Sequence, residues 1–203
     1  MNEARNAILQ RVKQALAPLA TRAAYPEYSD DILVRSDAKH GGDLWTLFSE
    51  RLKGVSGKPF SDANELVSWL ESQGHKHGYC DPALLARLAP AFAGRLEIET
   101  QFARSRIDDY AFGITQAAGA IAETGTLILK DATTSSRLAA LAPWVHIAVL
   151  SRETIHPDLA AAVAALGNDP NIIWCTGPSK TADVEGILIE GVHGPGCQIA
   201  LLV

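Results

Sequence analysis

Cysteine is scarce in this 203-residue sequence: only Cys80, Cys175 and Cys197 occur, and no two of them form a C-x-x-C pair. Without such a pair the chain lacks the ligand pattern of a zinc knuckle or an iron–sulfur cluster. An odd number of widely spaced cysteines is typical of reduced thiols in a cytosolic protein. We therefore expect free thiols, a cytoplasmic location, and neither a metal nor another cofactor.

Long apolar runs and an excess of basic residues are missing as well. No run approaches the roughly 20 apolar residues that cross a membrane. Charged side chains interrupt the segment 1–16, unlike the apolar core of a signal peptide. The net charge of −5 offers no basic footprint for nucleic acid, and neither the P-loop spacing nor the G-x-G-x-x-G fingerprint is present. We expect neither a membrane nor a nucleic acid as a partner.

What the sequence does contain is the composition of an ordinary globular protein, with 47% hydrophobic and 20% charged residues. Apolar periodicity and capping residues predict helices that alternate with short apolar strands. This alternation is typical of an α/β fold whose largely parallel sheet is covered by helices. We expect one domain at 41–203, preceded by an N-terminal helix and connecting arm at 1–40.

Local signals predict the individual elements. Three short runs, at 126–130, 145–150 and 171–175, are apolar and contain β-branched residues, so we expect buried strands there. The four tryptophans, at 45, 69, 144 and 174, are expected in the core. Further strands are predicted at 58–60, 77–80, 95–100 and 198–203, and helices at 1–16, 43–53, from 61–62 to 74, from 81–82 onward, and at 157–166.

The segment 120–126 is the first candidate for a functional loop. An apolar stretch leads into Glu123, Thr124, Gly125 and Thr126, after which a strand resumes. Gly125 would allow a tight turn or a close approach to a ligand. Glu123 could act as a base, a nucleophile or a hydrogen-bond acceptor. The alternative is a hairpin turn with a solvated glutamate.

The second candidate loop, at 175–185, follows a predicted buried strand. Gly177 and Pro178 break that strand, and hydroxyl groups surround Lys180. If Ser179 or Thr181 capped a short helix, the free N–H groups of that helix would form an anion site beside the lysine. The alternative is an ordinary capped turn.

A third candidate loop, at 191–196, combines three glycines and a proline with His193. The imidazole could donate a proton or bind an anion, although a lone histidine can equally be structural. Arg137 could clamp a carboxylate or phosphate, or could be an ordinary surface arginine. His75 and His77 lie on one side of a predicted strand without a nearby carboxylate in the sequence, so we expect no metal site there.

Four motifs occur together in the second half of the chain. They are Ala-Ile-Ala-Glu-Thr-Gly-Thr at 120–126, Pro-Trp-Val-His-Ile at 143–147, Thr-Gly-Pro-Ser-Lys-Thr-Ala-Asp-Val-Glu at 176–185 and Gly-Val-His-Gly-Pro at 191–195. In this order and spacing they resemble the LUD-domain family over residues 113–203. The resemblance implies a fold similar to the superfamily of glucosamine-phosphate isomerases, ribose-phosphate isomerases and CoA transferases.

The same resemblance implies a role in L-lactate utilization, in which lactate is oxidised to pyruvate together with iron–sulfur partner proteins. Because this chain has no cluster-binding cysteine motif, it resembles the cluster-free component, which would bind a small anionic metabolite or a partner. We take Glu123 and His193 as candidate catalytic residues. The candidate ligand-binding residues are Thr124, Gly125, Thr126, Arg137, Gly177, Pro178, Ser179, Lys180, Thr181, Asp183 and Gly194.

Three hypotheses remain open at this point. The first is the accessory role just described. The second is an autonomous isomerase or transferase for a phosphorylated or carboxylated metabolite, with Glu123 as base or nucleophile. The third is a structural or regulatory scaffold. Both ligand-binding hypotheses require the loops at 123–126, 177–181 and 193–195 to converge on one cleft, which we expect beyond the carboxyl ends of strands.

Overall fold

The computed structural model of the chain describes residues 2–18, 42–167, 169, 171–182 and 187–203. The chain divides into two units, Met1–Arg35 and Ser36–Val203. In the first unit, helix α1 (Asn2–Leu16) confirms the predicted N-terminal helix. Its apolar side chains Ile8, Leu9, Val12 and Leu16 are all exposed. The predicted connecting arm, at 21–40, lies outside the described residues.

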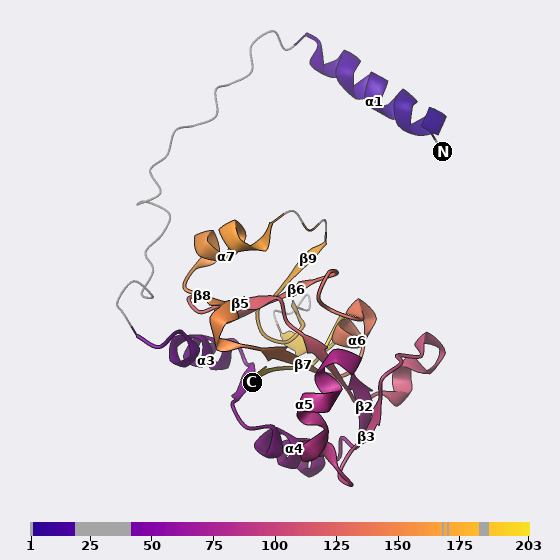
Figure 1. The fold of residues 1–203 in the computed structure, drawn as a ribbon. Coiled ribbons are helices and arrows are strands. Elements are labelled where there is room, and N and C mark those ends of the chain that lie inside the picture. The colour runs from indigo at the N-terminus through magenta and orange to yellow at the C-terminus, as the bar shows by residue number, and fades with distance from the viewer. Residues whose placement is uncertain (1, 19–41, 168, 170, 183–186) are drawn as a thin grey trace. The chain divides into compact units, whose positions relative to one another are not determined.

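A six-stranded, entirely parallel sheet forms the centre of the second unit (Figure 1). Its strand order is β1-β12-β7-β4-β2-β3, so the last strand of the chain lies inside the sheet, between β1 and β7. The strands are β1 (Lys58–Phe60), β2 (His77–Cys80), β3 (Glu97–Glu99), β4 (Phe112–Gln116), β7 (Val145–Leu150) and β12 (Cys197–Leu202).

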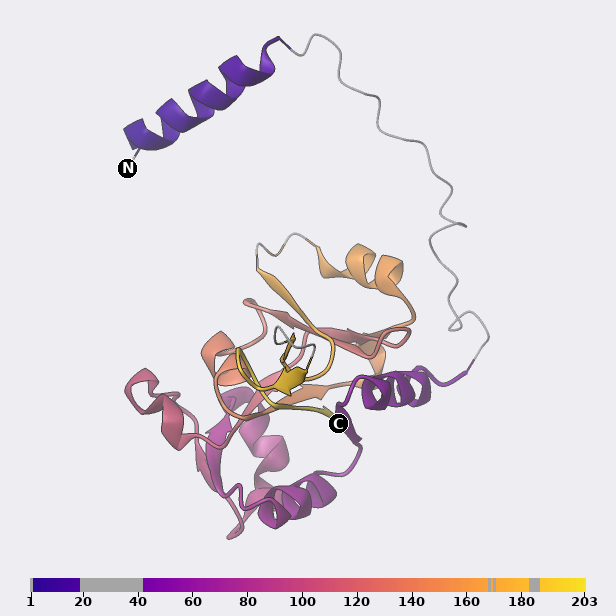
Figure 2. The same cartoon turned by 180° about the vertical axis from the view of Figure 1, so that it is seen from behind.

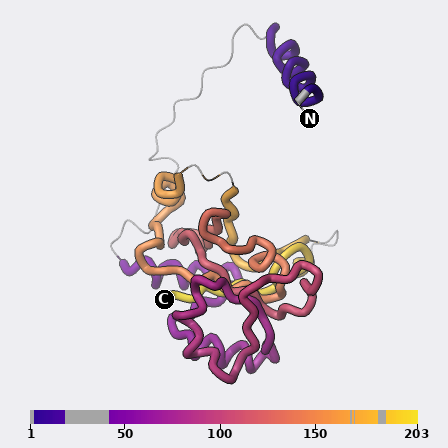
Figure 3. The backbone as a smooth tube through the Cα atoms, turned by 45° about the vertical axis from the view of Figure 1, so that its right-hand side comes forward, coloured from indigo at the N-terminus to yellow at the C-terminus, as the bar shows by residue number. Residues whose placement is uncertain are grey.

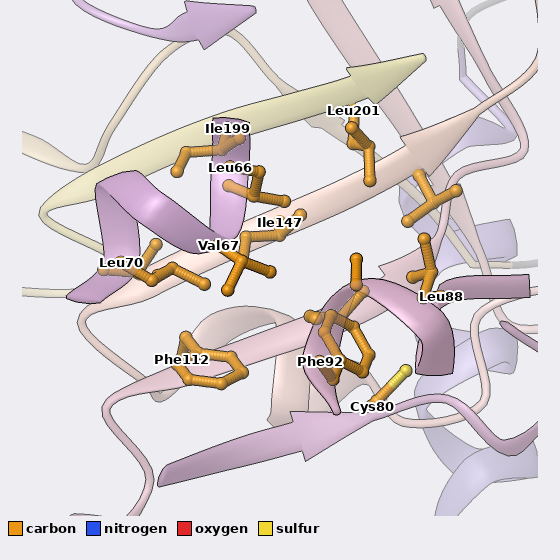
Figure 4. Packing of buried hydrophobic residues seen from close by; sticks show 14 of the residues in the cluster. Leu66, Val67, Leu70, Cys80, Leu88, Phe92, Phe112, Ile147, Ile199 and Leu201 are labelled. Atoms are coloured by element: carbon orange, nitrogen blue, oxygen red, sulfur yellow. The ribbon is translucent and has the colours of Figure 1, made fainter. Parts of the chain in front are cut away.

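One face of this sheet is covered by α4 (Ala63–Ser72) and α5 (Pro82–Phe92). The two helices begin where the sequence predicts, because the carboxylates of Asp62 and Asp81 accept hydrogen bonds from the backbone N–H groups of Asn64 and Ala83. Figure 4 shows helix residues such as Leu66 and Phe92 pointing toward strand residues such as Ile147. This packing forms the larger apolar core of the unit.

The opposite face packs against a second, four-stranded sheet of order β8-β5-β6-β9. After β4 the chain leaves the parallel sheet, forms the antiparallel β5–β6 pair and returns as β7. The course of the backbone is drawn as a tube in Figure 3. Helix α7 lies on the far side of the second sheet, as seen in Figures 1 and 2. These elements are β5 (Gly119–Ile121), β6 (Thr126–Lys130), β8 (Ile155–His156), α7 (Leu159–Leu166) and β9 (Ile172–Cys175).

Several shorter elements complete the described part of the unit. Helix α3 (Leu44–Gly54) contributes Phe48 and Leu52 to the core between the two sheets. Strands β10 (Lys180–Ala182) and β11 (Leu188–Glu190) form a separate antiparallel pair. The remaining elements are α6 (Arg137–Leu141), η2 (Arg104–Asp109) and η3 (Arg152–Thr154). No helix among the described ranges is long and apolar enough to span a membrane.

The structure confirms the predicted α/β fold with a largely parallel sheet, but it corrects two expectations about burial. Strand β9 is not buried, because it lies at the edge of the second sheet. Trp144 and Trp174 are 52% and 39% exposed, so they do not belong to the core. Strands β4 and β5 were not predicted; both contain glycine and lack a clear alternation of apolar and polar residues.

Candidate functional site

Hydroxyl groups connect the first two candidate loops. The side-chain oxygen of Thr126 lies 2.7 Å from that of Thr124 and 2.8 Å from that of Thr176. Thr126 begins β6 and Thr176 follows β9, and these two strands pair in antiparallel register. The loop after β5 and the loop after β9 are therefore neighbours, as both ligand-binding hypotheses require.

Each of these two loops contains a glycine at a position where a residue with a side chain would be strained. Gly125 and Gly177 have φ angles of +67° and +76°. A Cβ atom at Gly125 would lie 2.4 Å from the backbone nitrogen of Leu52, and one at Gly177 would lie 2.2 Å from the carbonyl oxygen of Val55. Both turns thus press directly against the C-terminal end of α3, where a side chain has no space.

Backbone hydrogen bonds connect the second loop to the third. The N–H group of Ser179 donates to the carbonyl oxygen of Pro195 at 2.8 Å, and the N–H group of Gly191 donates to the carbonyl oxygen of Ser179 at 2.9 Å. Gly194 also lies close to Ser179, since a Cβ atom on the glycine would be 3.3 Å from the serine Cβ. The loops around 177–179 and 193–195 therefore form one continuous structure.

A cavity of about 410 Å³, which we call the loop pocket, opens between these two loops. Its polar lining residues are Thr176, Ser179, His193 and Gln198. Its other lining residues are Leu141, Ile173, Trp174, Cys175, Gly177, Pro178, Gly194 and Pro195. Mostly apolar walls with a few polar groups are typical of a site for a small molecule.

Five predicted site residues, Gly177, Pro178, Ser179, His193 and Gly194, line the loop pocket. Glu123 does not; it is half-buried in the turn between β5 and β6, and its N–H group donates to the carbonyl oxygen of Pro157 at 3.1 Å. This turn corresponds to the hairpin alternative for the first loop. The hydroxyl chain through Thr126 brings the turn next to the loop pocket but not into its wall.

The charged residues of the predicted site also lie elsewhere. The ammonium group of Lys180 contacts the hydroxyl of Ser56 at 3.0 Å and the carbonyl oxygen of Val55 at 3.4 Å, at the end of α3. Arg137 forms an ion pair with Asp131 at 2.9 Å, half-exposed, as expected for a surface arginine. Asp183 lies outside the described residues.

The conditional prediction of a helix capped by Ser179 or Thr181 is wrong, and the prediction that the site lies at strand ends holds only in part. Lys180 and Thr181 belong to strand β10, which pairs with β11, so no helix begins at 179–181 and the helical anion site does not form there. The position of the loop pocket matches the expected strand ends only in part. It lies at the carboxyl end of β9, but at the amino end of β12, where Gln198 is the second residue of the strand.

Sequence reasoning missed a chain of three buried polar side chains behind the loop pocket. The ring nitrogen Nε2 of His146 lies 2.9 Å from the hydroxyl of Thr115, and Nδ1 lies 3.1 Å from the amide oxygen of Gln198. Thr115 and His146 are fully buried and Gln198 is 2% exposed. Because β4, β7 and β12 are neighbours, the three side chains meet on one face of the parallel sheet. The signal available was a polar residue inside each of three apolar runs.

Burial keeps His146 and Cys175 neutral. Burial lowers the pKa of His146 to about 4, an effect that the hydrogen bond with Gln198 only partly offsets, so the imidazole carries no charge near neutral pH. Burial also raises the pKa of the Cys175 thiol in the pocket wall to about 11. The thiol is therefore protonated and is a poor nucleophile.

The histidine pair considered for a metal serves other contacts. The ring of His77 lies 3.0 Å from a carboxylate oxygen of Glu99 and 2.9 Å from the carbonyl oxygen of Asp109. Its pKa is raised, mainly by the hydrogen bond to the Asp109 backbone and also by Glu99. Within the described ranges, no three histidine, cysteine, aspartate or glutamate side chains come together in a group that could hold a metal ion.

Several curated proteins similar to this chain are named lactate utilization protein C. The relative from Oceanobacillus iheyensis is 35% identical over 91 residues, which cover 41% of this chain and 39% of that protein. The relative from Deinococcus radiodurans is 33% identical over 105 residues, 49% of this chain and 50% of that protein. The one from an Exiguobacterium species is 38% identical over 91 residues, 41% and 40% of the two chains. The matched part thus spans half or less of each relative's length.

A crystal structure of a DUF162 family protein from Deinococcus radiodurans has a similar fold. It superimposes with a TM-score of 0.58 at 22% identity, over 79% of this chain and 96% of the other. The family model for the LUD domain matches residues 61–203, which include the loop pocket and every strand of the two sheets except β1. The chain therefore belongs to the LUD-domain family.

Proposed function

We propose that this protein is an accessory component of L-lactate utilization that contains no iron–sulfur cluster and acts with iron–sulfur partner proteins. The shared name of its curated relatives supports the pathway. The positions of the three cysteines fit this proposal, since Cys80, Cys175 and Cys197 come from separate strands, β2, β9 and β12. Electron transfer would then take place on the partners.

The loop pocket is the proposed binding site for a small anionic metabolite of this pathway. The observation that carries the proposal is the convergence of the 177–179 and 193–195 loops on one cavity. The imidazole of His193 would donate a hydrogen bond to the carboxylate of the ligand. The hydroxyl of Ser179 and the amide of Gln198 would donate hydrogen bonds and fix the orientation of the ligand.

The geometry favours this accessory role over an autonomous isomerase or transferase. The enzyme hypothesis places Glu123, Lys180 and His193 around one ligand, yet only His193 lines the loop pocket. The likeness to the superfamily of sugar-phosphate isomerases and CoA transferases remains part of the proposal at the level of fold. Its support is the parallel sheet with a second, mixed sheet packed on one face.

Growth and binding experiments test the proposal together. A strain without the gene should grow normally on glucose but poorly on L-lactate, and the wild-type gene should restore growth. Purified protein should bind lactate or pyruvate in a calorimetric titration. The variants Ser179→Ala and His193→Ala should each weaken binding by roughly ten- to a hundredfold, because each removes a hydrogen bond to a charged ligand.

Lys180→Ala is the matched control, because this lysine lies beside Ser56 and does not line the loop pocket. Its binding affinity should equal that of the wild type. Undiminished growth of the deletion strain on L-lactate would refute the pathway role. Equal loss of affinity in the Lys180 variant and the pocket variants would refute the assignment of the site.

A further inference from the structure

The loop pocket is larger than a lactate ion requires. Its volume is about 410 Å³. One water molecule takes up about 30 Å³ of the liquid, and even at that share for each of its six non-hydrogen atoms a lactate ion would fill about 180 Å³. More than half of the loop pocket would then contain no atom of the ligand.

Apolar side chains form one part of the wall around this space. Ile173 and Trp174 come from β9, and Leu141 is the last residue of α6. Among the described residues that line the loop pocket, none is aspartate, glutamate, lysine or arginine. A larger ligand would therefore meet no charged partner for a second ionic group, and its additional atoms should be apolar.

Two of these apolar side chains are in contact with solvent. Trp174 is 39% and Leu141 37% exposed, and neither belongs to an apolar cluster of the described core. A ligand gains roughly fourfold in affinity for each methylene group that leaves water for an apolar wall. The methyl group of lactate can cover little of this surface, whereas an aromatic ring covers more and also packs favourably on an indole.

Polar lining residues for the acid end of a ligand come from other segments of the chain. Ser179 and His193 belong to the two loops that the hydrogen bond from the N–H group of Ser179 to the carbonyl oxygen of Pro195 joins at 2.8 Å. These residues and Trp174 line the same cavity. A ligand with an acid group at one end and an apolar group at the other can therefore contact both sets.

Resting on the proposed function, we propose that the loop pocket binds 2-hydroxy acids with a large apolar side chain, above all an aromatic ring, more tightly than lactate. Phenyllactate, which carries a phenyl ring on the methyl carbon of lactate, is the simplest such acid. By the same measure its 12 non-hydrogen atoms require about 360 Å³, which the loop pocket provides. The ring packs against Trp174, while Ser179 and His193 bind the carboxylate.

Calorimetric titration of the full-length protein with L-lactate, L-2-hydroxyisocaproate and L-phenyllactate tests this preference. The affinity should rise in that order. Phenyllactate should bind roughly 10- to 100-fold more tightly than lactate, because the burial of a large apolar side chain yields about that gain. If lactate binds as tightly as phenyllactate, the inference is overturned, while lactate remains the proposed ligand.

Variants locate the preference within the loop pocket. Trp174→Ala should weaken the binding of phenyllactate roughly fivefold more than that of lactate, and Trp174→Phe, which keeps an aromatic ring, should restore most of the difference. Leu159→Ala provides the comparison, because this exposed side chain of α7 does not line the loop pocket, and its ratio of affinities should equal that of the wild type. Ser179→Ala should weaken both acids by the same factor, because Ser179 binds the group that they share.

The remaining outcomes separate this inference from the proposed function. If Trp174→Ala and Leu159→Ala change the ratio of affinities equally, the aromatic ring does not bind against Trp174 and the inference is overturned. If Trp174→Ala does not fold, the titrations of the wild type decide alone. If the wild type binds none of the three acids, this inference and the proposed ligand both fail, whereas the growth experiment still judges the pathway role.

Discussion

At the scale of single residues, backbone conformation and local space decide which positions tolerate change. Gly125 and Gly177 both adopt positive φ angles and both touch the end of α3. Gly74 has a similar φ of +78°, but a Cβ atom there would have nothing within 4 Å. The comparison separates two physical effects, strain in the backbone and collision with a neighbour.

Replacing Gly125 with alanine should therefore destabilise the protein more than replacing Gly74. The left-handed conformation alone costs an alanine roughly 1–2 kcal/mol. Gly125→Ala adds a collision with the backbone of α3, so its loss in the free energy of unfolding should be at least twice that of Gly74→Ala. Urea denaturation followed by circular dichroism measures both. Equal losses in the free energy of unfolding of the two variants would show that α3 can move away from the new side chain without an energetic penalty.

The buried imidazole of His146 makes stability depend on pH. Its pKa falls from the ordinary 6.5 to about 4 in the folded protein. The unfolded chain therefore binds more protons between these values, and stability is fully present above pH 6.5 and declines as the pH falls toward 4. The contribution lost over this window is about 3 kcal/mol, since each pKa unit corresponds to about 1.4 kcal/mol.

The comparison of wild type with His146→Gln isolates this contribution. The free energy of unfolding of the variant should decline less steeply between pH 6.5 and pH 4. His77→Gln is a useful contrast, because the raised pKa of His77 stabilises the protein below pH 6.5, and this contribution is lost as the pH rises through the folded pKa. If the free energy of unfolding changed with pH equally in the wild type and in His146→Gln, the pH dependence would not come from His146.

At the scale of elements, capping residues determine where helices begin. The carboxylate of Asp43 accepts hydrogen bonds from the backbone N–H group of Thr46 at 3.2 Å and from its hydroxyl at 2.9 Å. The same carboxylate forms an ion pair with Arg152. These contacts position α3, against which the turns at Gly125 and Gly177 pack.

Asp43→Ala should lower the free energy of unfolding by about 1 kcal/mol, because the first turn of α3 loses its cap. Asp43→Asn should retain most of the stability, since an amide oxygen also caps. Arg152→Ala removes only the exposed ion pair and should cost less, about 0–1 kcal/mol. Thermal unfolding of the three variants provides the measurement. If Arg152→Ala lost more free energy of unfolding than Asp43→Ala, the ion pair rather than the helix cap would be the main contribution of Asp43.

Elements with strong local signals could be predicted from the sequence, and elements that depend on distant partners could not. The helices that begin after Asp43, Asp62 and Asp81 are confirmed, because each cap lies beside its own helix. Strand β10 looked like a capped turn, because its strand character arises only from pairing with β11. The exposure of β9 could not be predicted either, since it depends on the position of that strand at the sheet edge.

At the scale of the whole molecule, the features of the site that have local sequence signals could be predicted, and those that depend on distant partners could not. The sequence indicated that loops 177–181 and 193–195 would meet, and residues 177–179 and 193–194 do line one cavity. It did not indicate that Lys180 would turn toward α3, because Ser56 is 124 residues away along the chain. The buried partners of His146 were missed for the same reason, since they come from two other strands.

The division of the chain into an N-terminal part and a folded domain stays a prediction, which truncation can test. A variant that lacks residues 1–40 should unfold at the same urea concentration as the full chain, because the described residues that form the core of the second unit come from α3 and the elements after it. Phe48→Ala in the full chain is the control that disrupts the core, and its free energy of unfolding should fall by about 3–5 kcal/mol. A truncated chain as unstable as that variant would contradict the division.

The position of His146 also bears on how three parallel strands find their alignment. Alternate residues of β7 face opposite cores: Val145, Ile147 and Val149 face α4 and α5, while Ala148 and Leu150 face the second sheet. Shifting β7 by one residue would exchange these faces and move the imidazole in among aliphatic side chains. An unpaired polar group there costs roughly 2–7 kcal/mol. The strands β4, β7 and β12 are otherwise mostly apolar. A shift that separated His146 from Thr115 on β4 and Gln198 on β12 would leave a buried polar group without a partner, so these three residues favour the observed register.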